Sequence, residues 1–171
     1  RGISIAILNS ISEFTKRLVR YDQIIVHTED NKRTLVNRNF DSEKIQIMPH
    51  GAFTFFNEYY KNSTNGSDEN CILFFGYIIK NKGVEYLLEA IPIISKEIPD
   101  IKLIIAGEGD ISKYSQYMVD NPYLEIYNEF IPNEKVSELF HRAKVVVLPY
   151  TYHQGHSGVL TIAFSFGKAV V

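Results

Sequence analysis

The segment at residues 145–171, VVVLPYTYHQGHSGVLTIAFSFGKAVV, is the most informative part of the chain. It predicts a buried strand over 145–149, a glycine-containing turn, a helix over 158–166 and the start of a second strand. A turn of this kind at a helix N-terminus can hold phosphate, because unpaired N–H groups of the first turn and the positive end of the helix dipole face the anion. The segment therefore predicts a nucleotide or another phosphate-containing ligand.

Outside this segment, apolar strand-like runs alternate with helical patterns. Strands are predicted over 71–76, 101–106 and 124–127, and helices over 84–94, 111–119 and 133–143. We expect Pro92 to kink the first of these helices and Asn133 to cap the last. Alternation of this kind predicts an α/β fold, a Rossmann-like parallel sheet with helices on both faces. The ligand site of such a sheet lies beyond the carboxyl ends of its strands.

A polar segment at residues 61–70, KNSTNGSDEN, has the composition of a linker loop and divides the chain. The part before it shows an incomplete α/β pattern, with helices expected over 10–20 and 29–40 and strands over 23–28 and 44–49. We interpret residues 1–60 as the tail of one domain with its hinge, and 71–171 as an incomplete second domain. Because the chain lacks an initiator Met and stops inside an apolar run, we expect it to be a fragment of a longer protein.

Composition narrows the function classes. The net charge of −2 argues against non-specific nucleic-acid binding, so no nucleic-acid partner is expected. The single cysteine, Cys71, precludes an internal disulfide and heads an apolar run, which predicts a core thiol in a reducing, cytoplasmic setting. No apolar run is long enough to cross a bilayer, so no membrane span is expected.

Six segments carry a family resemblance by their order and spacing. They are QIIVHT at 23–28, IQIMPHG at 45–51, FFGYIIKNKGVEYLLEA at 74–90, LIIAGEG at 103–109, IPNEKVSELFHRAKVVVLPY at 131–150, and the stretch at 155–171. Together they resemble the GT-B glycosyltransferases of the retaining group 1 (family 4-like) type. The resemblance implies two Rossmann-like domains facing a cleft, with residues 1–60 as the end of the N-terminal acceptor domain and 71–171 as a truncated C-terminal donor domain.

The family's first donor motif places an Arg after a strand-ending Gly, and a Lys a few residues later, on the donor diphosphate. Here Gly76 ends the strand and Lys82 matches the Lys position, whereas Tyr77 stands at the Arg position and cannot supply its charge. Lys80 is a candidate to replace part of that charge. The resemblance implies donor binding by Gly76, Lys80 and Lys82, with Lys82 also catalytic. The alternative is that both lysines are solvated loop residues.

The second motif is a pair of Glu residues that flank the phosphate-binding turn and contact the donor sugar and the ribose. Their positions here are Gln154 and Ile162, so both carboxylates are missing. Gln154 can still hydrogen-bond a sugar hydroxyl and is the second expected catalytic residue, whereas Ile162 cannot bind ribose. Thr161 or Ser165 is a candidate to contribute in its place.

The turn at Gly155, His156, Ser157 and Gly158 is expected to cradle phosphate through backbone N–H groups and the Ser157 hydroxyl. A purely structural turn is the alternative. His153 and His156 bracket this turn, but no Asp, Glu or Cys lies nearby in sequence, so we expect no metal and no other cofactor.

Two further segments bear on the site. His50 precedes Gly51 at the hinge and either faces the cleft or is a satisfied loop histidine. We expect Gly107 and Gly109 to form a tight strand exit rather than a dinucleotide fingerprint, because the third glycine is missing. In the family, the segment corresponding to 128–131 often contacts the nucleotide base through its main chain.

The leading hypothesis is a glycosyltransferase that moves a sugar from a nucleotide-diphospho-sugar to a carbohydrate or lipid-linked acceptor, with retention and without metal. Lipid-linked acceptors also leave peripheral membrane contact open. The first alternative is a nucleotide-sugar epimerase on the same scaffold. The second is a non-catalytic or degenerate nucleotide-sugar-binding module, which the altered positions Tyr77, Gln154 and Ile162 favour. The family's catalytic His would precede Arg1, so the fragment alone is expected to be inactive. The oligomeric state is left open.

Overall fold

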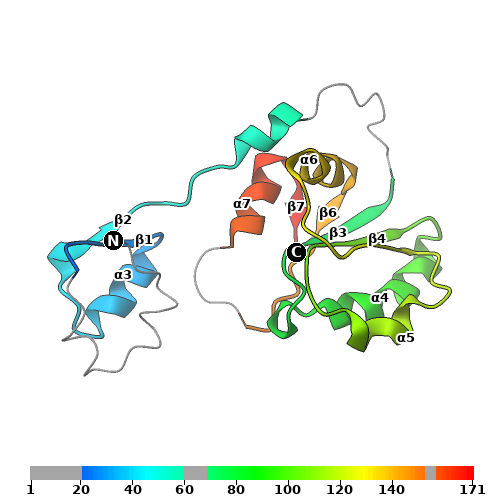
Figure 1. Cartoon of the computed structure of the whole chain (residues 1–171), viewed down its shortest axis with the longest axis horizontal. Helices are drawn as coiled ribbons and strands as arrows, with labels where there is room; N and C mark the ends of the chain where they lie inside the picture. The colour runs from blue at the N-terminus through cyan, green and yellow to red at the C-terminus, as the bar shows by residue number, and fades with distance from the viewer. Residues whose placement is uncertain (1–20, 60–68, 153–156) are drawn as a thin grey trace. The chain divides into compact units, whose positions relative to one another are not determined.

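The computed structural model describes residues 21–59, 69–152 and 157–171, which fall into two compact units (Figure 1). Among the described residues, the first unit comprises 21–51 and Ser157, and the second comprises 52–59, 69–152 and 158–171. The helix predicted over 10–20 and most of the predicted linker lie outside the described residues. No helix of the described ranges is long and apolar enough to span a bilayer.

In its described residues, the first unit contains a pair of parallel strands and one α-helix. Strands β1 (Ile24–Val26) and β2 (Ile45–Ile47) pair in parallel, with Ile24 opposite Ile45. Helix α3 (Glu29–Val36) connects them and begins at Thr28, whose Oγ1 accepts a hydrogen bond from the Asn31 N–H at 3.1 Å. A short 3₁₀ helix, η1 (Ser42–Lys44), precedes β2. These elements confirm the predicted strand–helix–strand order.

The second unit is built on a five-stranded sheet in the order β5-β4-β3-β6-β7, with every pairing parallel. The strands are β3 (Cys71–Phe75), β4 (Lys102–Ala106), β5 (Leu124–Tyr127), β6 (Val145–Val146) and β7 (Ala169–Val170). Between them run α4 (Val84–Glu97), η4 (Ser112–Tyr114) with α5 (Ser115–Met118), α6 (Asn133–Arg142) and α7 (Gly158–Ser165). The predicted α/β parallel sheet is confirmed.

Each face of this sheet carries its own core, because alternate residues of a strand point to opposite faces. Along β3, Cys71 and Leu73 pack with the buried residues of α6 and α7, whereas Ile72 and Phe74 pack with those of α4. Figure 1 shows α4 and α5 on one side of the sheet and α6 and α7 on the other. Helices therefore cover both faces, as predicted.

Residues 52–59 pack on the second unit, although the sequence grouped residues up to 60 with the first. The 3₁₀ helix η2 (Thr54–Tyr59) brings Phe56 into the core on the α6 side of the sheet. The Phe53 N–H donates to Ser165 Oγ at 3.1 Å, and Asn57 Nδ2 donates to the Ser165 carbonyl at 3.2 Å. Burial of aromatic rings thus places residues 52–59 in the second unit, although they precede the polar loop that marked the predicted boundary.

One local prediction about a helix was wrong. Asn133 does not cap α6: the N-cap position is Pro132, and Asn133 Nδ2 donates to Tyr59 Oη at 3.2 Å. Helix α4 contains Pro92 and continues to Glu97, and the kink expected at Pro92 stays a prediction. Ser95 Oγ donates to the Pro92 carbonyl at 3.1 Å in the following turn.

Replacement of Phe56 by Ala should destabilise the second unit, because this ring is 8% exposed in the core. We expect the free energy of unfolding to fall by about 3 kcal/mol, measured by urea denaturation of the full-length protein. The adjacent Phe55, 43% exposed, is the matched control, and Phe55→Ala should cost less than about 1 kcal/mol. Equal effects of the two changes would contradict the packing of η2 on this unit.

Candidate functional site

The strand order places a topological switch point between β3 and β6. From β3 the chain crosses to β4 and then to β5 on one side, and it returns to β6 on the other side of β3. The helices that follow these two strands, α4 and α7, lie on opposite faces of the sheet, and in open α/β sheets ligands bind at such a switch point, beyond the carboxyl ends of the strands. Both predicted donor motifs follow these two strands.

The exit of β3 is a close approach of backbones that only glycine permits. Gly76 has φ +121° and donates its N–H to the Ala106 carbonyl at 2.9 Å. Gly107 has φ +141°, and a Cβ on it would lie 2.2 Å from the Gly76 oxygen. A Cβ on Gly109 would lie 2.3 Å from the Ile78 oxygen. The predicted tight strand exit at 107–109 is confirmed, and it leaves the backbone itself at the carboxyl edge of the sheet.

The ammonium of Lys82 lies over an aromatic ring from the second loop. Lys82 ends the 3₁₀ turn η3 (Lys80–Lys82), and its Nζ is 3.6 Å from the centroid of the Tyr150 ring. Both side chains are half-buried. Among the residues that the structure describes, no carboxylate forms an ion pair with Lys82. A positive charge without an anionic partner thus lies where the loops after β3 and β6 meet.

Backbone contacts fix the two loops against each other around this pair. Gly83 adopts φ +67°, and a Cβ there would lie 2.0 Å from the Pro149 oxygen. The Thr151 N–H donates to the Asn81 carbonyl at 3.1 Å, and Asn81 Nδ2 donates to the Tyr152 carbonyl at 3.2 Å. The position of Lys82 is therefore set by both loops.

The remaining residues of the first motif lie apart from this pair. Lys80 begins η3 and is exposed, and Tyr77, at the position of the family's Arg, is 67% exposed. The structure therefore joins Lys82, but not Lys80, to the loop after β6. The roles of Gly76, Lys80 and Lys82 in donor binding remain predictions.

The N-terminus of α7 lies beside the β3 exit. Helix α7 begins at Gly158, directly after the buried Ser157, and Val159 Cγ2 would lie 3.5 Å from a Cβ on Gly76. Thr161 is half-buried one turn further along. Gln154, Gly155 and His156 lie outside the described residues, as does His153. The first N–H groups of α7 can therefore stabilise an anion near the β3 exit.

Two residues of α7 are engaged in packing. Ile162 is 9% exposed and belongs to the core, which agrees with the expectation that it does not bind ribose. Ser165 Oγ accepts from the Phe53 N–H at 3.1 Å and donates to the Thr161 carbonyl at 2.9 Å. The Ser165 hydroxyl therefore tethers residue 53 to the helix, and ligand contact by Thr161 stays a prediction.

The loops after β4 and β5 are also joined at this edge. Asn128 Oδ1 accepts a hydrogen bond from the Gly109 N–H at 3.0 Å. Asp110 accepts hydrogen bonds from the Ser112 N–H and hydroxyl, and these bonds lower the pKa of its carboxyl. Tyr150 and Asn81 were not singled out from the sequence, and Asn128 was considered only for its main chain, because each side chain acts through a contact between loops that are distant along the chain.

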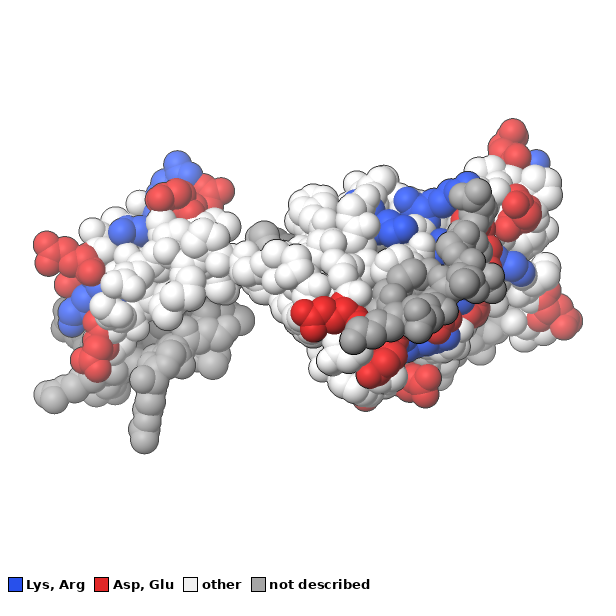
Figure 2. Space-filling view, turned by 90° about the horizontal axis from the view of Figure 1, so that it is seen from above, with Lys and Arg blue, Asp and Glu red and all other residues white. Residues whose placement is uncertain are grey.

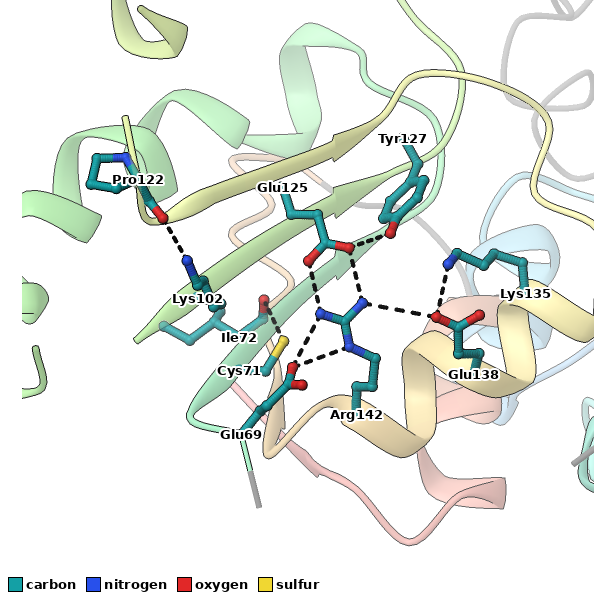
Figure 3. Close-up of polar contacts among 10 residues, drawn as sticks. All are labelled: Glu69, Cys71, Ile72, Lys102, Pro122, Glu125, Tyr127, Lys135, Glu138 and Arg142. Atoms are coloured by element: carbon teal, nitrogen blue, oxygen red, sulfur yellow. Dashed lines mark hydrogen bonds and ion pairs between the residues drawn. The ribbon is translucent and has the colours of Figure 1, made fainter. Parts of the chain in front are cut away.

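A network of ion pairs lies at the opposite, amino-terminal edge of the sheet (Figure 3). Arg142, at the end of α6, donates to both oxygens of Glu125 at 2.9 and 2.8 Å and to Glu69 Oε2 at 3.2 and 3.1 Å. Tyr127 Oη also donates to Glu125. The Arg142 hydrogen bonds, against the opposing effect of burial, lower the pKa of Glu125 to about 2. This network ties α6 to β5 and to the segment before β3, and its charges compensate one another.

Other titratable groups do not form a reactive site. Burial raises the pKa of the Cys71 thiol to about 12, and its side chain is fully buried, which confirms the predicted core thiol. No group of three or more His, Cys, Asp or Glu side chains suited to a metal occurs in the described ranges. His50 follows β2 in the first unit, where its ring centroid is 5.2 Å from that of His27. Its part in a cleft stays a prediction.

Surface charge on the described residues is mixed. Figure 2 shows both basic and acidic side chains on the face that it presents, with uncharged residues among them. On the face shown, this mixture agrees with the net charge of −2.

With the fold and this edge of the sheet described, the family can be identified. The family model described as "Glycosyl transferases group 1" matches residues 69–171, and the chain belongs to this family. An uncharacterised glycosyltransferase of Methanocaldococcus jannaschii is 36% identical over 88 residues, 50% of this chain and 22% of that protein. Another from Haemophilus influenzae is 28% identical over 153 residues, 88% of this chain and 41% of that protein. The chain thus spans less than half of these relatives.

Solved structures agree with the fold. HepE of Anabaena, in complex with UDP-glucose, has a TM-score of 0.74 and 14% identity, covering 99% of this chain and 51% of that one. WaaG, a glycosyltransferase involved in lipopolysaccharide biosynthesis, has a TM-score of 0.72 and 17% identity, covering 99% of this chain and 54% of that one. At these identities the likeness concerns the fold, which is the α/β fold of GT-B glycosyltransferases.

Acid should weaken the contribution of the Arg142 network to stability. The Glu125 pKa in the folded state, about 2, lies below its ordinary value of 4.5, so this stability is fully present above pH 4.5 and is lost as the pH falls toward 2. After allowance for solvent screening, we expect Glu125→Gln to lower the free energy of unfolding by about 1–2 kcal/mol at pH 7 and by little at pH 2.

The measurement is urea denaturation at a series of pH values. Glu97→Gln, at an exposed position of α4, serves as the matched control and should show no such pH-dependent difference. A Glu125→Gln difference that stayed constant down to pH 2 would contradict the assignment of Glu125 as an ionised partner of Arg142.

Proposed function

We propose that the protein is a glycosyltransferase that moves a sugar from a nucleotide-diphospho-sugar to an acceptor hydroxyl with retention at the anomeric carbon. Family membership supports the class of reaction. The observation that carries the donor assignment is the Lys82 ammonium, which has no carboxylate partner among the described residues and lies at the switch point between β3 and β6.

The chemistry of this edge suits a nucleoside diphosphate leaving group. As the bond between the anomeric carbon and the phosphate oxygen breaks, negative charge grows on that oxygen. An ammonium stabilises this charge more in the transition state than in the ground state, which is the condition for catalysis. The first N–H groups of α7 provide further donors beside the Gly76 exit.

In this proposal the acceptor hydroxyl attacks the anomeric carbon from the same face as that from which the leaving group departs. Its proton passes to the departing phosphate oxygen, so the products are the glycoside and the nucleoside diphosphate. Gln154 and Thr161 are assigned to hydroxyls of the donor, and Gly155, His156, Ser157 and Gly158 to the diphosphate. HepE was solved with UDP and glucose and with UDP-glucose, which makes a uridine nucleotide the first donor to test.

The proposal also includes the acceptor domain and the acceptor that it binds. A carbohydrate or lipid-linked acceptor fits the reaction, and a lipid-linked one would bring a cytoplasmic enzyme into peripheral contact with a membrane. Because the family's catalytic His is expected outside this chain, the proposed activity is that of the full-length protein.

One observation favours a second function, a non-catalytic nucleotide-sugar-binding module. Tyr77 is exposed at the position of the family's Arg, and Ile162 is buried where the family has a carboxylate, so two donor contacts are lost. Such a module would bind the nucleoside diphosphate but would release none from a nucleotide-sugar. Turnover by the full-length protein therefore separates the two functions.

Lys82→Ala in the full-length protein should weaken the binding of the preferred nucleoside diphosphate and lower kcat/KM. Loss of a charge-assisted hydrogen bond predicts a change of about 10- to 100-fold in each. Calorimetric titration with UDP, GDP and ADP measures binding, and release of nucleoside diphosphate from the corresponding sugar conjugates measures turnover.

The matched control for this test is Lys102→Ala. Lys102 starts β4 at the opposite edge of the sheet, where its Nζ donates to the Pro122 carbonyl at 2.6 Å. This change should leave nucleotide affinity and turnover at the wild-type values. Unaltered binding and turnover in Lys82→Ala would refute the assignment of the diphosphate site.

Transfer should continue in excess EDTA, because the proposal assigns stabilisation of the leaving phosphate to Lys82 and backbone N–H groups rather than to a divalent cation. The measurement is the initial rate of nucleoside diphosphate release with EDTA, and with Mg²⁺ or Mn²⁺ restored. Loss of activity in EDTA that either cation recovers would overturn the metal-independent mechanism while leaving the class of reaction intact.

A further inference from the structure

The strongest unassigned feature of the molecule is the contact between Lys82 and Tyr150. The ammonium nitrogen lies 3.6 Å from the ring centroid, well within the range of about 6 Å over which a cation is attracted to the face of a ring. The two residues come from different loops, which follow β3 and β6. Half-burial of both side chains strengthens the attraction, because water competes less for the charge.

The backbone around Tyr150 is held by contacts that do not involve the Lys82 side chain. Pro149, directly before Tyr150, has its carbonyl packed against Gly83, where only a residue without Cβ fits. On the other side, the Thr151 N–H donates to the Asn81 carbonyl at 3.1 Å. Contacts on both sides of Tyr150 therefore hold its backbone against the turn that carries Lys82.

An aromatic partner has a different effect on a phosphate site from a carboxylate partner. A carboxylate would neutralise the lysine, and an incoming diphosphate would have to displace it. The ring of Tyr150 attracts the ammonium but carries no net charge, so the full positive charge stays available to an anion. It also restricts a flexible side chain before the ligand binds, which reduces the ordering that binding requires.

We propose that Tyr150 is a positioning residue that holds the Lys82 ammonium, uncompensated, at the switch point where the donor diphosphate binds. The proposal rests on the function proposed above and adds to it the residue through which Lys82 is pre-placed. Tyr150 acts on the diphosphate through Lys82, so its contribution depends on the presence of that lysine.

The test is a double-mutant cycle in the full-length protein. Tyr150→Leu and Tyr150→Phe are each made in the wild type and in Lys82→Ala, and UDP, GDP and ADP are titrated by calorimetry. Tyr150→Leu should weaken binding of the preferred nucleoside diphosphate and lower kcat/KM about 5- to 20-fold, whereas Tyr150→Phe, which keeps the ring, should stay near the wild-type values. In the Lys82→Ala background, Tyr150→Leu should have no further effect.

The cycle distinguishes the possible failures. If Lys82→Ala weakens nucleotide binding but the Tyr150→Leu effect is the same with and without the lysine, Tyr150 has only a structural role and this inference is overturned. If the wild type binds none of the three nucleoside diphosphates, the proposed function fails and the inference fails with it. If Tyr150→Phe loses as much as Tyr150→Leu, the ring is not the source of the effect.

A second measurement needs no variant of Tyr150, so it does not depend on whether such variants are stable. In the wild type, the Lys82 εCH₂ protons should resonate upfield of other lysines because they lie over a ring, and Lys82→Arg identifies their signal. Addition of the preferred nucleoside diphosphate should shift this resonance. A Lys82 signal at the ordinary lysine position in the free protein would show that the ammonium is not held on the ring, and would overturn the inference.

Discussion

The pairing of β3 with β4 on one side and with β6 on the other is the constraint on which the rest of the second unit depends. Parallel strands require crossover helices, and these cover both faces of β3, whose residues Cys71, Leu73 and Phe74 are fully buried. The same pairing puts the switch point between β3 and β6, where ligands of open α/β sheets bind at the carboxyl edge. The core and the candidate site thus have one origin.

The two edges of this sheet use charge in opposite ways. At the amino edge, Arg142 is held by Glu125 and Glu69, so its positive charge is compensated and the group serves stability. At the carboxyl edge, Lys82 has a ring as its partner and no carboxylate among the described residues. Lys135 is a useful contrast, because it contacts the Tyr127 ring at 4.6 Å but also pairs with Glu138 at 2.8 Å. A cation left uncompensated costs stability unless a ligand uses it.

Much of the fold could be predicted from the sequence because it follows from periodicity and glycine. The strands, the two-sided sheet and the tight exit at Gly107 all depend on local pattern. The contacts of Tyr150, Asn81 and Asn128 could not, since they join loops that only the strand order brings together. The strand predicted over 145–149 is longer than β6, which ends at Val146. The N–H groups of Val147 and Leu148 still donate to the carbonyls of Leu73 and Val171, but the regular ladder does not continue.

The residues that differ from the family's motifs fit a site in which the placement of one positive charge matters more than the number of charges. Tyr77 contributes no cation and Ile162 packs into the core, whereas the ammonium of Lys82, the matched cation of the first motif, reaches the loop after β6. A single ammonium interacts weakly with phosphate when it must first be ordered and stripped of a counter-charge. Both of those costs are reduced when the ammonium lies on an uncharged ring held by backbone contacts on either side. The loss of the Arg therefore makes the packing around Lys82 more important.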